Sequence, residues 1–328
     1  MEPYVTIFIL CYNSSKTIAE TLDSAFRQTY GNLDLLINDD ASGDGSADII
    51  SRWIESHKDR FRNIRILHSE KNMGINYSYN KGIKNCVTEW VKPIAGDDIL
   101  FDNCIEKNMK YVMEHKICSI LFSQEVIFHE DKNNGFHRGL YDEKYMIKLD
   151  SLLPEEQYQK ILRRDIYYAS TIFLNADIFK KIGGITTKIR NIDDTPLILK
   201  YVSSGYPLHF MNLDTTYYRL SNSVSRSEGY IYNEKHIEQT YIMKRLIIYP
   251  NIKPVCIFYW YDEFVTFIRY KIIIKGLKNR NVPIVRIVNY FLMLFSVSAW
   301  KKKILESFYS IQAKRKNKDL QRTNNNSY

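Results

Sequence analysis

The chain has 328 residues, 45% of them hydrophobic, which is enough for one large α/β domain with an appendage or for two ordinary domains. Its formal charge of +9 is uneven, because residues 226–328 hold 19 Lys and Arg against 7 Asp and Glu, whereas residues 1–225 hold 27 against 30. The five cysteines occur singly, which argues against a disulfide framework or a zinc site and favours a reducing cytoplasm.

Strand and helix patterns alternate four times in the first hundred residues. The expected strands are residues 4–12, 33–37, 63–67 and 89–95, and the expected helices follow from about residue 18, at 47–57 and at 75–86. The first strand starts so early that we expect no secretory signal. Short loops between these elements predict βαβ units around a parallel sheet, which binds ligands beyond the carboxyl ends of its strands.

Polar residues follow three of the predicted strands. They are Tyr12 with Asn13, the pair Asp39 and Asp40, and the pair Asp97 and Asp98. Because parallel strands end at one edge of a sheet, we expect all of them to face one crevice. The last pair could bind Mg²⁺ or Mn²⁺, which prefer carboxylate, water and phosphate oxygens.

The pattern after residue 99 is less regular. We expect a helix at 103–115, a strand at 119–128, a polar loop at 129–139, a strand at 168–174, a helix at 195–204 and short strands within 206–225.

The C-terminal region, residues 226–328, is expected to be helical, basic and amphipathic, with a disordered tail at 321–328. Its longest uncharged apolar run, residues 287–300, is too short for a membrane span, which needs roughly 20 residues. The lysines and arginines at 301–303 and 314–318 suit anionic lipid headgroups, so an interfacial helix is one interpretation. The other is a helical subdomain that packs on the body.

Four segments together resemble glycosyltransferase family 2, the inverting nucleotide-sugar transferases of GT-A fold. The resemblance runs from about residue 5 to residue 225, and its segments are VTIFILCYNSSKTIAETLDSAFRQTYGNLDLLINDDASGDGS, NMGINYSYNKGI, VKPIAGDDILFD and GGITTKIRNIDDTPLILKYVSSGYPLHF. It implies residues 1–225 as an α/β transferase domain, with a mixed, mostly parallel Rossmann-like sheet flanked by helices, followed by the C-terminal helical extension.

The resemblance also implies roles for the nucleotide-binding residues. Tyr12 would stack on the base, and Asp40 would accept the N3–H of uracil, while Asp39 would hold the loop. Asp98 would ligate the Mg²⁺ or Mn²⁺ bound to the diphosphate, and Asp97 would reach the ribose or an ion-bound water.

A second set of roles concerns the reaction. Asp194 would be the general base that takes the proton of the acceptor hydroxyl, and Asp193, Tyr218 and Arg219 would be possible donor or acceptor contacts. The chain departs from the family at Gly96, where the first acidic residue of a D-x-D is missing, and at Tyr79, where many relatives carry Arg.

Each acidic pair also has an ordinary structural interpretation. Asp pairs at strand ends cap helices or form Asx turns, and Asp193 and Asp194 could be N-terminal acids favoured by a helix dipole. Tyr218 and Arg219 could form a surface salt bridge. The occurrence of all these pairs at one predicted edge favours the functional interpretation.

The sequence therefore predicts a cytoplasmic, membrane-peripheral bacterial glycosyltransferase that uses a UDP-sugar. Its expected partners are a polyprenyl-diphosphate-linked glycan acceptor, as in O-antigen or capsule assembly, and the inner-leaflet surface. The alternatives are transfer to polyprenyl phosphate or protein, a non-catalytic nucleotide-sugar scaffold, and a nucleic-acid-binding protein. The last rests only on the basic region, so nucleic acid is not an expected partner.

Overall fold

The computed structural model describes residues 2–117, 119–129, 136–138, 143–163, 169–220, 229–252, 256–297 and 300. The chain divides into two compact units. The first consists of Met1–Ser223 with Glu238–Asn251, and the second of Val224–Ile237 with Ile252–Tyr328. The predicted boundary at residues 225 and 226, the basic residues at 301–318 and the predicted tail lie outside the described residues.

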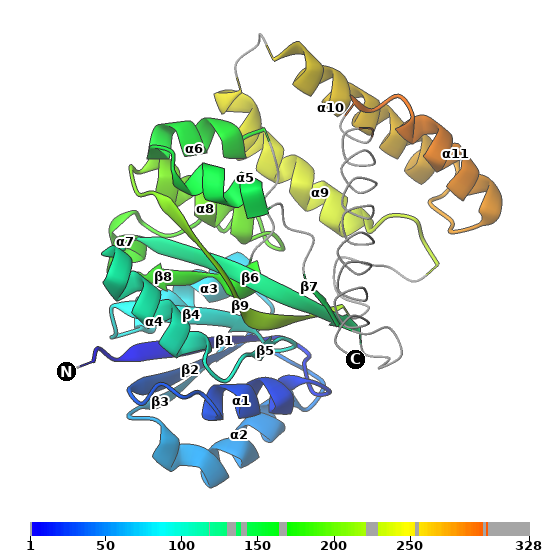
Figure 1. The fold of residues 1–328 in the computed structure, drawn as a ribbon. Coiled ribbons are helices and arrows are strands. Elements are labelled where there is room, and N and C mark those ends of the chain that lie inside the picture. Colours follow the sequence, from blue (N-terminus) through cyan, green and yellow to red (C-terminus); the bar gives the residue numbers. More distant parts are fainter. Residues whose placement is uncertain are drawn as a thin grey trace, which may run out of the picture. The chain divides into compact units, whose positions relative to one another are not determined.

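Strands and helices alternate from β1 to β4 in the first unit, and the order is less regular after β4 (Figure 1). The strands are β1 (Val5–Cys11), β2 (Leu33–Asp39), β3 (Ile64–His68), β4 (Trp90–Ala95), β5 (Ile99–Leu100), β6 (Ile120–His129), β7 (Phe136–Arg138), β8 (Phe173–Asn175) and β9 (Leu208–Leu220). The helices up to residue 203 are α1 (Ile18–Phe26), α2 (Ser46–His57), α3 (Ile75–Asn85), α4 (Cys104–His115), α5 (Glu143–Asp150), α6 (Pro154–Ile161), α7 (Ala176–Lys181) and α8 (Asp194–Ser203), with short 3₁₀ turns η1 (Lys58–Arg60) and η3 (Ala169–Thr171).

The described strands form one mixed sheet in the order β3-β2-β1-β4-β8-β6-β9-β5, with β7 paired to β6. The pairs β1·β2, β1·β4, β2·β3 and β6·β9 are parallel, and the pairs made by β8, β7 and β5 are antiparallel. The predicted α/β fold, a mixed sheet flanked by helices, is confirmed.

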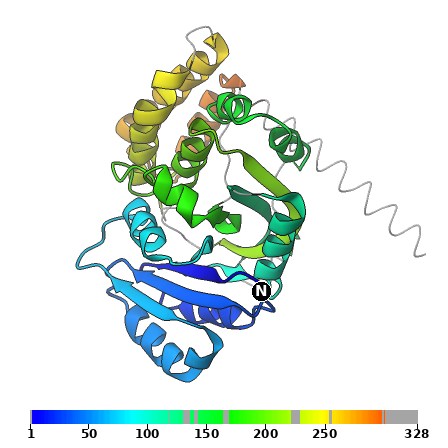
Figure 2. The same cartoon turned by 90° about the vertical axis from the view of Figure 1, so that its left-hand side faces the viewer.

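Helices cover both faces of the N-terminal strands. Alternation along β1 sends Ile7 and Ile9 into a cluster with Ile18 and Leu22 of α1, while Phe8 on the other face meets Tyr79 of α3 edge to face at 6.1 Å. Figures 1 and 2 show α1 and α2 on one side of these strands and α3 on the other. Burial on both faces explains why β1 and β2 are apolar nearly throughout.

Three expectations for the second half of the sheet were wrong. Residues 208–220 form one 13-residue strand, β9, because it pairs with β6 over nearly its whole length. The strand expected at 168–174 is reduced to β8, preceded by the turn η3. The loop expected at 129–139 includes β7, which pairs with residues 126–128 of β6.

The helical segments after residue 233 are shorter than the sequence pattern suggests. They are α9 (Glu234–Met243), the π-helical turn η4 (Lys244–Ile248), the 3₁₀ turn η5 (Tyr249–Asn251), α10 (Ile257–Tyr270), the π-helical turn η6 (Lys271–Gly276) and α11 (Pro283–Met293). The apolar run at 287–300 is helical from 287 to 293 as part of α11, which begins at Pro283.

In the second unit, α10 and α11 pack together. Asn279 joins them to the preceding chain, because its side chain pairs with the backbone N–H and carbonyl of Tyr232, at 3.0 and 2.7 Å. Among the described residues, no helix combines the length and apolar character that crossing a bilayer requires.

The contact between α3 and β1 gives a test of the fold. A Cβ added at Gly82 would lie 1.9 Å from Cζ of Phe8, so we expect Gly82→Ala to lower the free energy of unfolding by about 1–3 kcal/mol, the usual cost of overpacking. Denaturant titration followed by circular dichroism measures this loss. Gly31→Ala, where no atom lies within 4 Å, is the control, and a Gly82 variant as stable as this control would contradict the packing.

Candidate active site

The carboxyl ends of three strands meet at one edge of the sheet. Cys11 of β1 is in register with Asp39 of β2, and Leu10 is in register with Ala95 of β4. Backbone hydrogen bonds continue this pairing beyond the strands, from Asp40 N to the carbonyl of Cys11 at 2.9 Å and from Gly96 N to that of Leu10 at 2.8 Å. The segments that carry Tyr12, Asp40 and Asp97 therefore leave the sheet side by side, as the sequence predicts.

The two carboxylates that follow β2 both hold neighbouring loops. Oδ1 of Asp39 accepts the N–H of Ser42 at 3.3 Å, so Asp39 secures the loop as expected, and its Oδ2 lies 3.7 Å from Nδ1 of His68. Asp40 is 4% exposed, and its carboxylate accepts the backbone N–H groups of Met73 at 3.0 Å and Gly74 at 2.8 Å. The sequence did not indicate this second loop contact of Asp40.

The loop held by Asp40 contacts the segment that carries the predicted base. Gly74 has a φ of 90°, and a Cβ there would lie 2.8 Å from the carbonyl oxygen of Arg190. Ile75 N donates to that same carbonyl at 2.8 Å. Asp40 and the acidic pair at 193 and 194 are therefore linked through one loop.

A second contact of α3 fixes the Gly183-Gly184 turn. Asn80 donates from Nδ2 to the carbonyl of Ile185 at 2.7 Å and accepts the N–H of Ile185 at 3.0 Å. Asn76, which is fully buried, donates to the carbonyl of Thr186 at 3.0 Å. Asn76 and Asn80 of the NMGINYSYNKGI segment thus hold the backbone of residues 185–186 against α3.

Asp193 and Asp194 lie at the start of α8. Asp194 is 8% exposed, and its Oδ1 accepts the N–H of Thr195 at 2.6 Å. Loss of hydration raises the pKa of Asp193 to about 6.

Tyr79 of α3 lies close to Asp193. Burial raises the pKa of Tyr79 well above its ordinary value, and the charge of Asp193 raises the pKa of Tyr79 further. Tyr79 is 1% exposed and belongs to the core.

The turn after β4 is held from β9 and from α1. Asp98 is 3% exposed, and its Oδ1 accepts the backbone N–H of Arg219 at 3.0 Å. The Arg219 guanidinium donates from Nε to the carbonyl of Asp97 at 2.7 Å and from Nη2 to Glu20 at 2.5 Å. Thr21 donates its hydroxyl to the carbonyl of Asp98 at 2.7 Å. Glu20 and Thr21 gave no signal in the sequence.

Burial dominates the electrostatics of this turn. It raises the pKa of Asp98 well above its ordinary value, and the charges of Asp97 and Glu125 raise it further, whereas the N–H of Arg219 and the charge of Lys92 oppose the shift. Lys92 is fully buried in β4 and donates to the carbonyls of Pro93, Ser170 and Ile172. Burial lowers the pKa of this lysine to about 8.

The pair Asp97 and Asp98 fits a nucleotide-bound divalent cation. Among the described residues, no three His, Cys, Asp or Glu side chains form a cation cluster. Mg²⁺ at nucleotide sites, however, needs only one or two carboxylates, since the substrate phosphates and water supply the other oxygens. Two adjacent carboxylates of which one is buried repel each other, and a divalent cation would relieve this repulsion.

The remaining predicted residues differ in position. Tyr12 follows β1 and is 44% exposed, so its ring is accessible to a base. Tyr218 is half-buried on β9, opposite Ile127 of β6. Arg219 is 7% exposed and forms a salt bridge with Glu20, whose side chain is 55% exposed, so the salt bridge considered for Arg219 is present; the same guanidinium donates to the carbonyl of Asp97.

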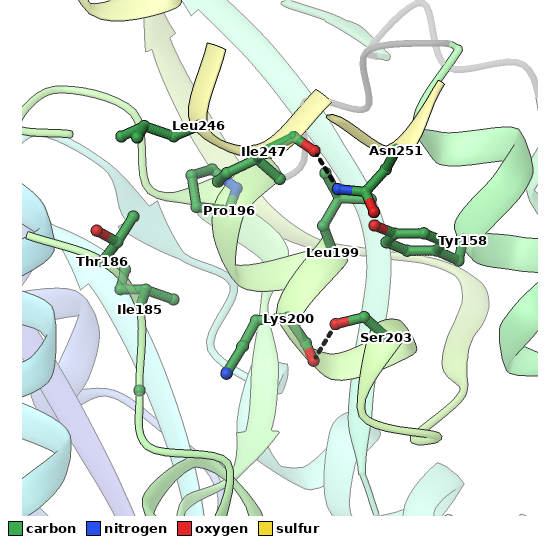
Figure 3. Close-up of a pocket in the computed structure, with 11 residues that line it drawn as sticks. Tyr158, Ile185, Thr186, Pro196, Leu199, Lys200, Ser203, Leu246, Ile247 and Asn251 are labelled. Atoms are coloured by element: carbon green, nitrogen blue, oxygen red, sulfur yellow. Dashed lines mark hydrogen bonds between the residues drawn. The ribbon is translucent and has the colours of Figure 1, made fainter. Parts of the chain in front are cut away.

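A pocket of about 300 Å³ lies beside α8 in the first unit (Figure 3). It is lined by Pro196, Leu199, Lys200 and Ser203 of α8, with the 184–186 loop, Tyr158 and the 246–251 segment. None of the predicted site residues lines it. The acidic edge described above, and not this pocket, is therefore the candidate active site.

A mixed α/β sheet with Tyr12 after β1 and acidic residues at the ends of β2 and β4 defines the class as a glycosyltransferase of GT-A fold. The family model described as Glycosyl transferase family 2 matches residues 6–177, which is more than half of the chain. The chain therefore belongs to glycosyltransferase family 2.

Curated relatives extend this similarity. The chain is 22% identical over 207 residues to "Putative glycosyltransferase EpsE" of Bacillus subtilis, covering 62% of this chain and 68% of that one. It is 25% identical to "Putative teichuronic acid biosynthesis glycosyltransferase TuaG" of the same organism (74% and 92% covered). It is 26% identical to "UDP-Glc:alpha-D-GlcNAc-diphosphoundecaprenol beta-1,3-glucosyltransferase WfaP" of Escherichia coli (78% and 92% covered).

Solved structures share the fold at low identity. TarS 1–349 of S. aureus in complex with UDP is similar with a TM-score of 0.54 and 15% identity, covering 82% of this chain and 72% of that one. A longer TarS structure is matched over only 43% of its length. The mannosyltransferase PcManGT from Pyrobaculum calidifontis, in complex with GDP-Man and Mn²⁺, has a TM-score of 0.52 and 13% identity, with 95% and 80% covered.

The contribution of Asp40 to the stability of the loop can be tested by experiment. We expect Asp40→Ala to lower the free energy of unfolding by about 1.5–3 kcal/mol, because it leaves the N–H groups of Met73 and Gly74 without their charged acceptor. Urea titration checks this value. Asp59→Ala, at an exposed position, is the control. If both variants unfold at the same urea concentration as the wild type, the Asp40 contacts do not stabilise the loop.

Proposed function

We propose that the protein is an inverting, metal-dependent glycosyltransferase that moves a hexosyl or N-acetylhexosaminyl group from a UDP-sugar to a hydroxyl of a lipid-linked glycan in surface polysaccharide assembly. The observation that carries this proposal is the alignment of Tyr12, Asp40 and Asp97 at one sheet edge, with a loop contact to the Asp193–Asp194 segment. The relatives support the reaction class, and WfaP supports the diphosphoundecaprenol acceptor by its name.

The uracil-binding role of Asp40 is compatible with its loop contacts. A carboxylate has about four lone-pair sites, and the N–H groups of Met73 and Gly74 leave acceptor capacity for the N3–H of a uracil. Tyr12 is exposed beside it for stacking on the base. The TarS complexes with UDP and UDP-GlcNAc support a UDP-sugar donor through the shared fold alone.

The acceptor is activated by Asp194 in this proposal. A sugar hydroxyl is a poor nucleophile, so a carboxylate within hydrogen-bond reach accelerates attack on the anomeric carbon by taking the proton in the transition state. The sugar then transfers with inversion, because the attack comes from the face opposite the departing diphosphate. Asp193, beside the base, contacts the donor or the acceptor.

Asp97 and Asp98 would hold Mg²⁺ or Mn²⁺ with the diphosphate. A cation bound there would supply positive charge that offsets the charge on the departing diphosphate, so the chain would need no acid for its departure. Asp98 would ligate the cation, and Asp97 would reach the ribose or a cation-bound water. Tyr218 remains a candidate contact at the end of β9.

We further propose that residues 1–225 form the transferase domain and that residues 226–328 attach it to the cytoplasmic face of the membrane. The helices α10 and α11 each carry an exposed apolar stripe at helical spacing: Ile257, Tyr261, Phe264 and Ile268 on α10, and Ile284, Ile287 and Phe291 on α11, continued by Leu294 directly after its end. The excess of Lys and Arg in this region complements anionic lipid.

Replacement of the proposed base tests the function. We expect Asp194→Asn to lower kcat by roughly 10²- to 10⁴-fold, the usual contribution of a general base, while UDP binding stays within twofold. Initial rates with a panel of UDP-sugars and a diphosphoundecaprenol-linked acceptor measure the first quantity, and calorimetry the second.

Asp177→Asn, an exposed acid in the first turn of α7, is the matched control for this variant. If Asp194→Asn turns over like the control while it binds UDP, Asp194 is not the base. If the wild-type protein binds no UDP-sugar and transfers none, the proposed function itself is wrong.

The membrane proposal has its own test. We expect the double variant Phe264→Glu, Phe291→Glu to lose most of its sedimentation with vesicles that contain anionic phosphatidylglycerol, because it places two charges on the apolar stripes at positions 62% and 57% exposed. Met113→Glu, exposed on α4 of the first unit, should bind like the wild type. Equal vesicle binding by the double variant and the control would exclude the stripes as the lipid contact.

A further inference from the structure

We infer that Arg219 and Glu20 are positioning residues that hold the Asp97–Asp98 turn in its cation-binding geometry, so that Arg219 does not itself contact the donor or the acceptor. This inference rests on the proposed function, because it concerns the residues that would bind the metal and the diphosphate. It replaces the donor or acceptor contact that the sequence suggests for Arg219.

The contacts of Arg219 all converge on this turn. Its backbone N–H donates to Oδ1 of Asp98 at 3.0 Å, and its Nε donates to the carbonyl of Asp97 at 2.7 Å. One residue of β9 therefore binds both members of the acidic pair. The first contact sets the orientation of the Asp98 carboxylate, and the second sets the backbone that carries it.

The guanidinium is itself held from two sides. Nη2 donates to the Glu20 carboxylate of α1 at 2.5 Å, and the guanidinium carbon lies 4.6 Å from the centre of the Phe128 ring of β6. With 7% of its surface exposed, Arg219 has little freedom to reach a ligand. A planar group that bonds a carbonyl and a carboxylate and faces an aromatic ring has a fixed orientation.

The opposite side of the turn is anchored by α1. Thr17 donates its hydroxyl to the carbonyl of Gly96 at 2.8 Å, and Thr21 donates to the carbonyl of Asp98 at 2.7 Å. Glu20 lies on α1 with Thr21, so α1 and its N-cap residue Thr17 bind the turn directly through Thr17 and Thr21 and indirectly through Glu20 and Arg219. The arrangement matches the outer contacts that orient metal ligands in proteins, whose loss typically lowers metal affinity by roughly 10- to 100-fold.

The chain offers a closely matched control for Arg219. Arg62 donates from Nε and Nη2 to the two carboxylate oxygens of Asp34, at 2.9 and 2.6 Å, and its guanidinium carbon lies 3.7 Å from the centre of the Tyr4 ring. It is likewise an arginine held by a carboxylate and an aromatic ring. Arg62 N bonds to Leu33 at the start of β2, so it lies at the amino ends of the strands, away from the acidic edge.

The test measures UDP binding by the full-length protein as Mn²⁺ is varied, together with binding in EDTA. We expect Arg219→Lys to raise the Mn²⁺ concentration at half-saturation by roughly 10- to 100-fold. The single ammonium group of lysine cannot reproduce the two hydrogen bonds that the guanidinium donates, one to the carbonyl of Asp97 and one to the carboxylate of Glu20. UDP binding in EDTA should stay within twofold of the wild type. Glu20→Gln should shift the Mn²⁺ requirement in the same direction but less, and Arg62→Lys should not shift it.

The outcomes separate this inference from the proposed function. If wild-type UDP binding does not respond to Mn²⁺, the metal role of the acidic pair fails. If the wild type responds and Arg219→Lys requires no more Mn²⁺ than Arg62→Lys, the positioning role is wrong. If Arg219→Lys loses as much UDP binding in EDTA as it loses in Mn²⁺, Arg219 contacts the nucleotide directly and the inference is overturned. Thermal unfolding of each variant identifies any that fails to fold.

Discussion

The parallel pairing of β1 with β2 on one side and β4 on the other is the constraint on which the candidate site depends. Because both pairs are parallel, the three strands end at one edge, and the register places Asp39 beside Cys11 and Ala95 beside Leu10. The residues that follow have no further sheet partners and can face a ligand. A shift of one residue in either pair would exchange the faces of all side chains on that strand, so the apolar cores on both sides of β1 also fix the acidic residues.

The carboxylates buried at this edge lose hydration and repel one another, so they need hydrogen bonds or positive charges from the protein. Asp40 obtains them from the backbone N–H groups of the loop before α3, and Asp98 from the backbone of Arg219. Lys92 contributes a buried positive charge, itself held by three carbonyls. Charge-assisted hydrogen bonds of this kind are stronger than neutral ones, and they order the loops that make them. The carboxylates therefore organise the edge even before a ligand binds.

The sequence predicted each boundary of the four N-terminal strands to within two residues, because burial on both faces makes β1, β2 and β4 nearly continuous apolar runs and their short loops limit the topology. It also located the acidic residues at the strand ends. It could not predict the partners of Arg219, since Glu20 is 199 positions away and meets it only through pairing of β9 and β5. Hydrophobic periodicity and short motifs describe neighbouring residues and cannot predict contacts between residues so far apart in the sequence. Lys92 is a signal of such contacts in the sequence, because a lysine inside an otherwise apolar strand is costly unless it is hydrogen-bonded.

The loop before α3 relates the two halves of the proposed reaction. Asp40, proposed to bind the uracil, holds Met73 and Gly74, and the next residue, Ile75, donates to the carbonyl of Arg190, three positions before Asp193. The asparagines of α3 fix the 184–186 turn on the same side. The loop that Asp40 holds is therefore also bonded to the segment that leads to the proposed base. Positioning contributes several kcal/mol to catalysis in general, so a rigid link between the donor and acceptor sides is what a single displacement requires. The absence of a Cβ at Gly74 allows that link, because any larger residue would separate the loop from Arg190.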